Sequence, residues 1–386
     1  MNKFSSLLAD PAISALQGAV LQDAARTLEE AVTIQQIPAP TFDEGKRAAY
    51  VSDRFHQLNL SSIDSDSLHN VYGCLPGTDP NRPAILLTAH TDTVFDARTS
   101  LATRREGDRI YGPGLGDNSL GVAALLSAAT LLRGQTLPAD IWFVANSREE
   151  GMGDLGGIKA VYQRLKDRVG SAIVLEGMAF GRVYHAGIAV RRLRISCKGQ
   201  GGHSWLHFGR ESAIHGLVRI GTAITHITVP DEPRTTFNIG VIEGGTTVNS
   251  IATNASFLLD LRSEDRDTLA ALEAKVREVV AAHQFADLTV EIEVVGDRPA
   301  GRIPVSHPLA QLSRQVLESI GVTAVFEMGS TDANVPLAAG LPAVTIGITH
   351  GSNAHRLDEY IETPPTAHGL WQMLLLVIAA SHGLAA

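Results

Sequence analysis

The stretch AILLTAHTDTVFD, residues 84–96, contains a strand that ends in two ionisable side chains. Residues 84–89 are almost entirely apolar, as in parallel strands whose two faces are both covered. His90 and Asp92 follow, and the two-residue period of a strand directs both side chains to the same side. Because ligands of α/β sheets gather at the carboxyl ends of strands, this stretch predicts a polar site at a sheet edge.

Short apolar runs and helical patterns alternate on both sides of this stretch. Strands are expected at residues 71–75, 85–89, 141–145 and 172–175, and helices at 120–132 and 157–166. After residue 298 the pattern resumes with a helix at 308–320, strands at 324–327 and 343–346, and a C-terminal helix at 370–380. The alternation predicts an α/β domain with a mostly parallel sheet between helices.

The segment between these two parts has a different order of elements. Its patterns predict strand 192–197, helix 211–227, strand 236–243, strand 255–262, helix 265–283 and strand 289–295. This β-α-β-β-α-β order is typical of a ferredoxin-like α+β domain. We therefore expect a discontinuous first domain, residues 1–188 and 298–386, interrupted by an inserted domain at 189–297.

Composition and charge disfavour several kinds of partner and site. The chain has 386 residues, a net charge of −9 and a pI of about 5.9, which disfavour nucleic acid and anionic membranes as partners. Only Cys74 and Cys197 are present, so neither a disulfide framework nor a thiolate metal site is expected, and a reducing cytoplasm fits best. The N-terminal residues predict a first helix rather than a signal peptide. The apolar run at 370–380 is too short to span a membrane.

Carboxylates and imidazoles recur where the predicted strands end. They are His90, Asp92, Asp117, Glu149, Glu150, Glu176 and His355. Carboxylates that converge on one sheet edge would repel one another, and one or two divalent cations would remove that conflict. Imidazole and carboxylate without thiolate suit zinc, with cobalt or manganese as alternatives.

Two cations need a shared ligand, and a carboxylate can bridge cations about 3.5–4 Å apart. We assign Asp117 to both cations, with one further pair of ligands for each: His90 and Glu176, and Glu150 and His355. Asp92 is expected to accept the imidazole N–H of His90 and so fix its tautomer.

Neighbouring side chains diverge, so only one of two adjacent acids can point at a cation. With Glu150 as a ligand, Glu149 is expected to act as the general base, taking a proton from water and passing it to the leaving amine.

Together these residues resemble the co-catalytic zinc peptidases and amidohydrolases, a family that includes peptidase T, carboxypeptidase G, aminoacylase, acetylornithine deacetylase and succinyl-diaminopimelate desuccinylase. The resemblance covers nearly the whole chain and rests on five motifs in order: the H-x-D of His90, the glycine-rich turn before Asp117, the pair Glu149-Glu150, Glu176 and the late His355. It implies a zinc-binding α/β domain with an inserted ferredoxin-like lid that usually forms a homodimer.

The resemblance also implies roles outside the metal ligands. His203 in GQGGHSW matches an imidazole that reaches the partner subunit's active site and stabilises an oxyanion. Asn249 and Arg262 look like substrate-binding residues, and Gly329, Ser330 and Asp332 match a loop that faces substrate. The family tends to have a cis peptide after the bridging aspartate, although Asn118 and Ser119 depart from its usual residues there.

These patterns favour hydrolysis of a peptide or amide bond in a small substrate by an exopeptidase, either a di- or tripeptidase or a carboxypeptidase-like enzyme. An N-acyl amino acid deacylase is the alternative, because deacylases and carboxypeptidases usually carry Glu where Glu176 stands, whereas the context of Asp117 resembles the di- and tripeptidases. A non-catalytic, ligand-binding dimer is a third possibility, and it is disfavoured because no ligand is missing.

Overall fold

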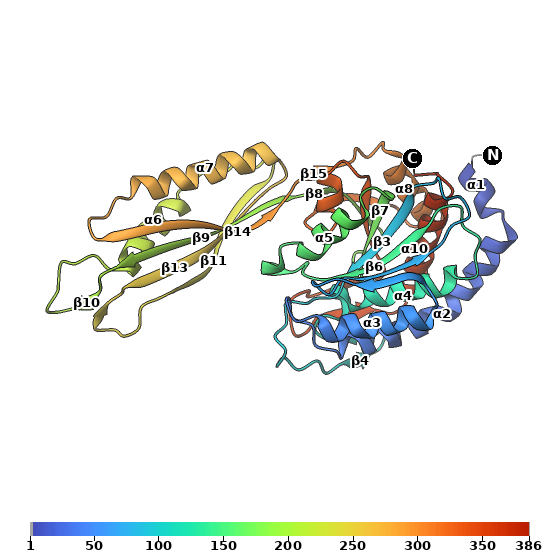
Figure 1. The fold of residues 1–386 in the computed structure, drawn as a ribbon, viewed down its shortest axis with the longest axis horizontal. Helices are drawn as coiled ribbons and strands as arrows, with labels where there is room; N and C mark the ends of the chain where they lie inside the picture. Colours follow the sequence, from blue (N-terminus) through green and yellow to red (C-terminus); the bar gives the residue numbers. More distant parts are fainter. Residues whose placement is uncertain (1–2, 386) are drawn as a thin grey trace. The chain divides into compact units, whose positions relative to one another are not determined.

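The computed structural model describes residues 3–385, and the chain divides into two units. The first runs to Gly187 and resumes at Gly301, and the second spans Ile188–Ala300 (Figure 1). The boundary after Gly187 lies one residue from the expected position, and the boundary before Gly301 lies three residues from it.

The first unit is built on a nine-stranded sheet with the order β1-β2-β6-β3-β7-β17-β8-β15, and β16 also pairs with β8. In that order the strands are Ser61–Ser65, Val71–Leu75, Ile141–Asn146, Ala84–His90, Val169–Glu176, Ala343–Gly347, Arg182–Gly187 and Gly301–Arg302, with β16 at Val325–Gly329. The four neighbours β6, β3, β7 and β17 are parallel. Their carboxyl ends therefore lie along one edge of the sheet.

Strand β3, which ends at His90, lies in the middle of this parallel group. Every residue of β3 and of β6 is buried, as predicted for strands covered on both faces. His90 is the last residue of β3 and pairs with Asn146, the last residue of β6. The prediction of a polar group at the end of a buried strand is confirmed.

Helices pack on this sheet and on one another. The helices are α1 (Lys3–Leu8), α2 (Pro11–Gln35), α3 (Gly45–Gln57), α4 (Leu120–Leu132), α5 (Gly156–Leu165), α8 (Pro308–Ser319), α9 (Asn334–Ala338) and α10 (Thr366–Ser381). Helix α4 packs on β3, β6 and β7, α2 lies against α4, and α10 contacts both helices (Figure 1). The stretch Leu115–Leu132 has a mean hydropathy of 1.3 and is 83% buried, so it serves as a core helix of this unit.

The N-terminal residues are helical, as predicted, but they form two helices. The side chain of Asp10 accepts the N–H of Ala12, and Pro11 occupies the first helical position of α2. Asp and Pro at these positions begin a new helix rather than continue one, so α1 and α2 are separate.

A second, four-stranded sheet was not predicted. Its order is β18-β19-β5-β4, with strands of two or three residues at Gly351–Ser352, Tyr360–Glu362, Arg109–Tyr111 and Arg104–Glu106. Strands this short carry too few residues for a two-residue period to be visible. The pairing of β19 with β5 brings the segment after His355 beside the segment before Asp117.

The inserted unit has the predicted ferredoxin-like order. Its sheet runs β11-β13-β9-β14, all antiparallel. The strands are β9 (Ala189–Gly199), β11 (Thr235–Gly244), β13 (Asn254–Ser263) and β14 (Leu288–Arg298), and helices α6 (Ala213–Thr225) and α7 (Arg266–Ala282) cover one face. A short ribbon of β10 (Gly202–His203) and β12 (Ser250–Ile251) is an addition that the sequence analysis missed.

Candidate metal centre

Four of the polar side chains come together because their strands are neighbours. His90 ends β3, Glu176 ends β7, and Glu149-Glu150 follow β6. These strands are parallel and adjacent in the order β6-β3-β7, so their carboxyl ends place the four side chains at one edge. The loops before α4 and after β18 add Asp117 and His355.

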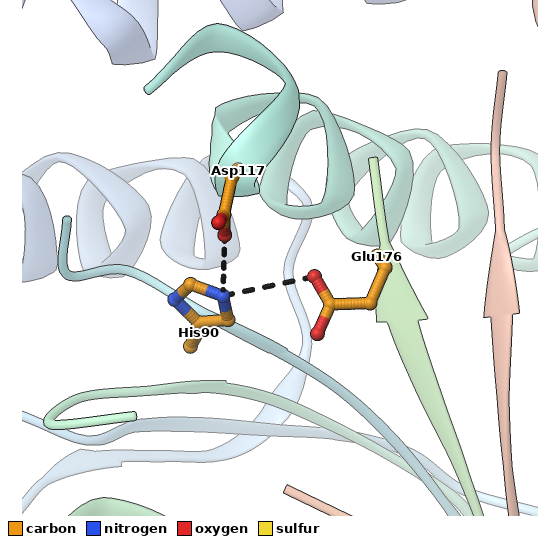
Figure 2. Close-up of side chains that lie close together, drawn as sticks. All are labelled: His90, Asp117 and Glu176. Carbon is orange, nitrogen blue, oxygen red and sulfur yellow. Dashed lines mark ion pairs between the residues drawn. The ribbon is translucent and has the colours of Figure 1, made fainter. Parts of the chain in front are cut away.

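Asp117 lies between the two imidazoles. Its Oδ1 is 3.2 Å from His90 Nε2, and its Oδ2 is 3.1 Å from His355 Nε2. Figure 2 shows His90 Nε2 facing both Asp117 and Glu176, whose Oε2 is 3.7 Å away. A carboxylate that presents one oxygen to each imidazole has the arrangement required of a bridging ligand.

Ligand atoms of the described residues form three close groups of three, and the carboxylate of Asp117 belongs to two of them. Those two are His90, Asp117 and Glu176, and Asp117, Glu150 and His355. The third is His90, Glu149 and Glu150, and within each group the ligand atoms lie within 4.8 Å of one another. His355 Nε2 is 3.1 Å from Glu150 Oε1. The two groups that contain Asp117 are the pairings predicted from the sequence, and the donor set of imidazole and carboxylate suits zinc, cobalt or manganese.

Burial and contacts between its members shift the pKa values of the cluster. Burial raises the pKa of Glu150 and of Glu176 to about 7. Bonds to Asp117 and Glu150 raise the pKa of His355 to about 10. Burial acts to raise the pKa of Asp117, but the bonds to His355 and His90 outweigh it and hold the pKa well below its ordinary value. The raised pKa values of Glu150 and Glu176 are those expected of buried carboxylates that no cation balances.

Asp92 holds the cluster in a way that differs in part from the prediction. His90 Nδ1 lies 3.0 Å from the backbone oxygen of Asp92 and 3.6 Å from its carboxylate. The carboxylate instead accepts the backbone N–H groups of Glu149 and Glu150, each at 2.9 Å. Residue 92 thus orients the imidazole through its main chain, while its side chain positions the two glutamates.

The loop that carries Glu149 and Glu150 is fixed by side-chain oxygens from three other elements. The N–H of Ser147 donates to Asn70 Oδ1 and that of Arg148 donates to Glu44 Oε1, which adds to the two bonds accepted by Asp92. Four consecutive backbone N–H groups therefore have side-chain acceptors. Asn70 and Glu44 were not predicted, since such bonds leave no local pattern in the sequence.

The turn before α4 is attached to the end of β7. The peptide between Asp117 and Asn118 is cis, as the resemblance implied. Asn118 Nδ2 donates to Leu175 O, and Asn118 Oδ1 accepts the N–H of Gly177, both at 2.8 Å. The residue that departs from the family pattern therefore binds the main chain on both sides of Glu176 and holds two ligand-bearing segments together.

The remaining predicted residues fall into two sets. Gly329 ends β16, and Ser330 follows it in the first unit. Asp332 is fully buried and accepts a bond of 2.7 Å from Asn146 Nδ2, and its role towards substrate stays a prediction. His203, Asn249 and Arg262 belong to the second unit and are exposed.

His203 and Arg262 are held by their own unit. His203 Nδ1 accepts the N–H of Trp205 at 3.2 Å, and the N–H of His203 donates to His207 Nδ1 at 2.9 Å. Arg262 Nε donates to Asp260 at 2.7 Å, which fixes the plane of the guanidinium. His203 thus caps a turn, and capping orients its ring.

Comparison with known proteins agrees with this geometry. The model of peptidase family M20/M25/M40 matches residues 86–378. A putative succinyl-diaminopimelate desuccinylase of Mycobacterium tuberculosis is 29% identical over 329 residues, covering 82% of this chain and 89% of that protein.

Solved structures share the fold. A Staphylococcus aureus tripeptidase has a TM-score of 0.76 at 21% identity, covering 93% of this chain and 99% of its own. A dinuclear metal-binding M20 peptidase of Bacillus subtilis has a TM-score of 0.67 at 14% identity, covering 93% and 98%. The chain is therefore a member of peptidase family M20/M25/M40, whose members are hydrolases of amide bonds.

Proposed function

We propose that this chain is an exopeptidase, either a di- or tripeptidase or a carboxypeptidase-like enzyme, that uses two divalent cations to hydrolyse a peptide bond in a small substrate. The observation that carries the proposal is Asp117, which presents one oxygen to His90 and the other to His355. A carboxylate in this position is expected where two cations share a ligand.

We propose zinc as the cation, because the two groups of ligands that share Asp117 offer imidazole nitrogen and carboxylate oxygen without thiolate. His90 and Glu176 would hold one ion, Glu150 and His355 the other, and Asp117 both. When bound, such a pair supplies charge that polarises the scissile carbonyl and lowers the pKa of the attacking water.

Glu149 is the proposed general base. Its backbone N–H is fixed by Asp92, and a ligand atom of its carboxylate lies within 4.8 Å of those of His90 and Glu150, so it can reach a proton beside the cluster. Glu149 would take a proton from the attacking water and deliver it to the leaving nitrogen.

His203 is proposed to stabilise the oxyanion. Because Nδ1 accepts the N–H of Trp205, the neutral ring carries its proton on Nε2. An Nε2–H donor is what a developing oxyanion requires. Arg262 would bind a substrate carboxylate, and Asn249, Gly329 and Ser330 would contact the rest of the substrate.

An N-acyl amino acid deacylase is the second candidate. Glu rather than Asp stands at position 176, as the resemblance associates with deacylases and carboxypeptidases, and the relative from Mycobacterium tuberculosis is described as a putative desuccinylase. Both candidates cleave an amide bond with the same residues, and they differ in whether the acyl group is an amino acid or a simple acid.

We also propose a homodimer formed through the second unit. The edge strand β11 exposes Val241 and Ile242, and helix α6 beside it exposes Val218. Exposed apolar side chains along an unpaired strand edge are typical of surfaces that associate. Light scattering at several protein concentrations tests this, and a monomer throughout would contradict it.

A cytoplasmic location is proposed because the two cysteines, Cys74 and Cys197, are buried free thiols. Fractionation of the source cells, with the protein detected by antibody, tests the location. Recovery outside the cytoplasm would reject it.

One experiment separates the catalytic proposals. Protein depleted by chelator and reloaded with zinc, cobalt or manganese would be assayed against dipeptides, tripeptides, C-terminally blocked peptides and N-acyl amino acids. An exopeptidase is expected to cleave the peptides, a deacylase the N-acyl amino acids, and neither to act without metal. Activity that persists after metal removal, or binding of these compounds without product, would reject metal-dependent hydrolysis.

A further inference from the structure

Glu359 is a buried acid that lies outside both groups of candidate ligands. Its Oε1 accepts the backbone N–H groups of Gly116 at 2.7 Å and Asp117 at 3.0 Å, and its Oε2 accepts that of Gly114 at 3.1 Å. It is fully buried, and no cationic side chain among residues 3–385 pairs with it. The N–H groups of one turn are therefore the hydrogen-bond partners of this carboxylate.

This carboxylate connects two segments that supply ligands to the same cation. Glu359 lies four residues after His355, at the end of the loop that leads into β19. The turn that it binds ends at Asp117, whose Oδ2 is 3.1 Å from His355 Nε2. The main chain adds to the connection, since Gly112 N–H donates to Glu359 O at 2.9 Å.

The other ligand-bearing segments are joined by different groups. Asn118 ties the turn to β7 on either side of Glu176. Asp92 ties β3 to the loop of Glu150. The carboxylate of Glu359 joins the segment that carries His355 to the turn that carries Asp117. Its removal should therefore affect the two cation positions unequally.

We propose that Glu359 is a positioning residue that fixes the separation of Asp117 and His355 and thereby sets the cation affinity of the position formed by Asp117, Glu150 and His355. The proposal rests on the ligand assignment proposed above. The position formed by His90, Asp117 and Glu176 keeps its connection through Asn118 and should change less.

The test compares Glu359→Gln with Glu362→Gln in the full-length protein. Glutamine has nearly the same shape as glutamate, but its amide nitrogen would face an N–H donor of the turn. Glu362 is in β19, three residues further along, and its side chain makes an ion pair of 3.2 Å with Arg109 at the surface. It is therefore a matched control for loss of one carboxylate.

Metal-depleted proteins would be titrated with zinc by calorimetry in the presence of a competing chelator. Wild type is expected to show two binding steps, and His355→Ala would identify the step that belongs to His355. In Glu359→Gln that step should weaken about 10- to 100-fold, which is typical for residues that orient metal ligands. The other step and both steps of Glu362→Gln should stay within about threefold of wild type. Glu359→Asp keeps the carboxylate on a shorter side chain, and it should weaken the His355 step by an intermediate factor. It replaces Glu359→Gln in the test if the glutamine variant does not fold.

Two outcomes would overturn the proposal. If both steps weaken equally, or if the melting temperature falls while both affinities are kept, Glu359 only stabilises the turn. A wild-type protein that binds fewer than two zinc ions would refute the ligand assignment as well, whereas a protein that binds two but hydrolyses nothing would refute only the proposed activity.

Discussion

The two units hold most of their candidate functional residues in different ways. In the first unit His90, Asp92 and Glu150 are buried, and their segments are joined by bonds between different elements. In the second unit His203 and Arg262 are exposed, and their partners lie within four residues of them along the chain. Under the proposed function, the first unit alone would prepare cation binding, and the second would contribute to turnover.

The largest effect is expected from Asp117→Asn, which tests whether the first unit depends on one shared carboxylate. An amide neither carries charge nor offers two equivalent oxygens, so both cations should lose a ligand. Zinc content after dialysis should fall from two ions to less than one, and activity on the best substrate should become undetectable. Two retained ions would show that Asp117 is not the bridge.

Glu149→Gln should separate chemistry from cation binding within the first unit. The variant keeps the shape of the side chain but cannot accept a proton, so kcat should fall about 10²- to 10⁴-fold, the usual contribution of a general base. Zinc content should stay at the wild-type value. Near-normal turnover would assign the base elsewhere.

His203→Ala tests the second unit. Loss of one oxyanion donor is expected to reduce kcat about 10²- to 10³-fold while zinc affinity stays unchanged. A neighbouring change, His207→Gln, removes the acceptor of the His203 N–H and should reduce kcat by less. If His203→Ala alters zinc affinity instead, the division of roles between the units is wrong.

The smallest effect concerns pH and needs no substitution. In metal-free protein the pKa values of Glu150 and Glu176 are raised to about 7, so the folded state binds more protons than the unfolded state above their ordinary value of 4.5. Stability from these groups is complete below about pH 4.5 and is lost as pH rises towards 7. The raised pKa of His355 acts in the same direction at higher pH.

Zinc should replace these protons. The difference in melting temperature between zinc-loaded and metal-free protein is therefore expected to widen from pH 5 to pH 8. A difference that is constant over this range would indicate that the carboxylates are not cation ligands.

Local patterns in the sequence determined most of the architecture. Periodicity predicts the buried strand that ends at His90, and the order of elements predicts the β-α-β-β-α-β insertion. The adjacent acids Glu149 and Glu150 follow another predicted buried strand. Periodicity works here because these strands and helices are long enough to repeat a pattern several times. The expectation of one or two cations followed from charge, since converging carboxylates need cations.

Only the tertiary structure decided how the ligands are held. Asn70, Glu44, Asn118 and Glu359 bind main-chain groups of segments that are mostly far from them in sequence, and such bonds depend on how the chain folds back on itself. The same holds for Asp92, whose carboxylate was expected at an imidazole and binds the N–H groups of Glu149 and Glu150. A sequence states which side chains can hold a cation, whereas their separation is set by hydrogen bonds between elements that only the fold brings together.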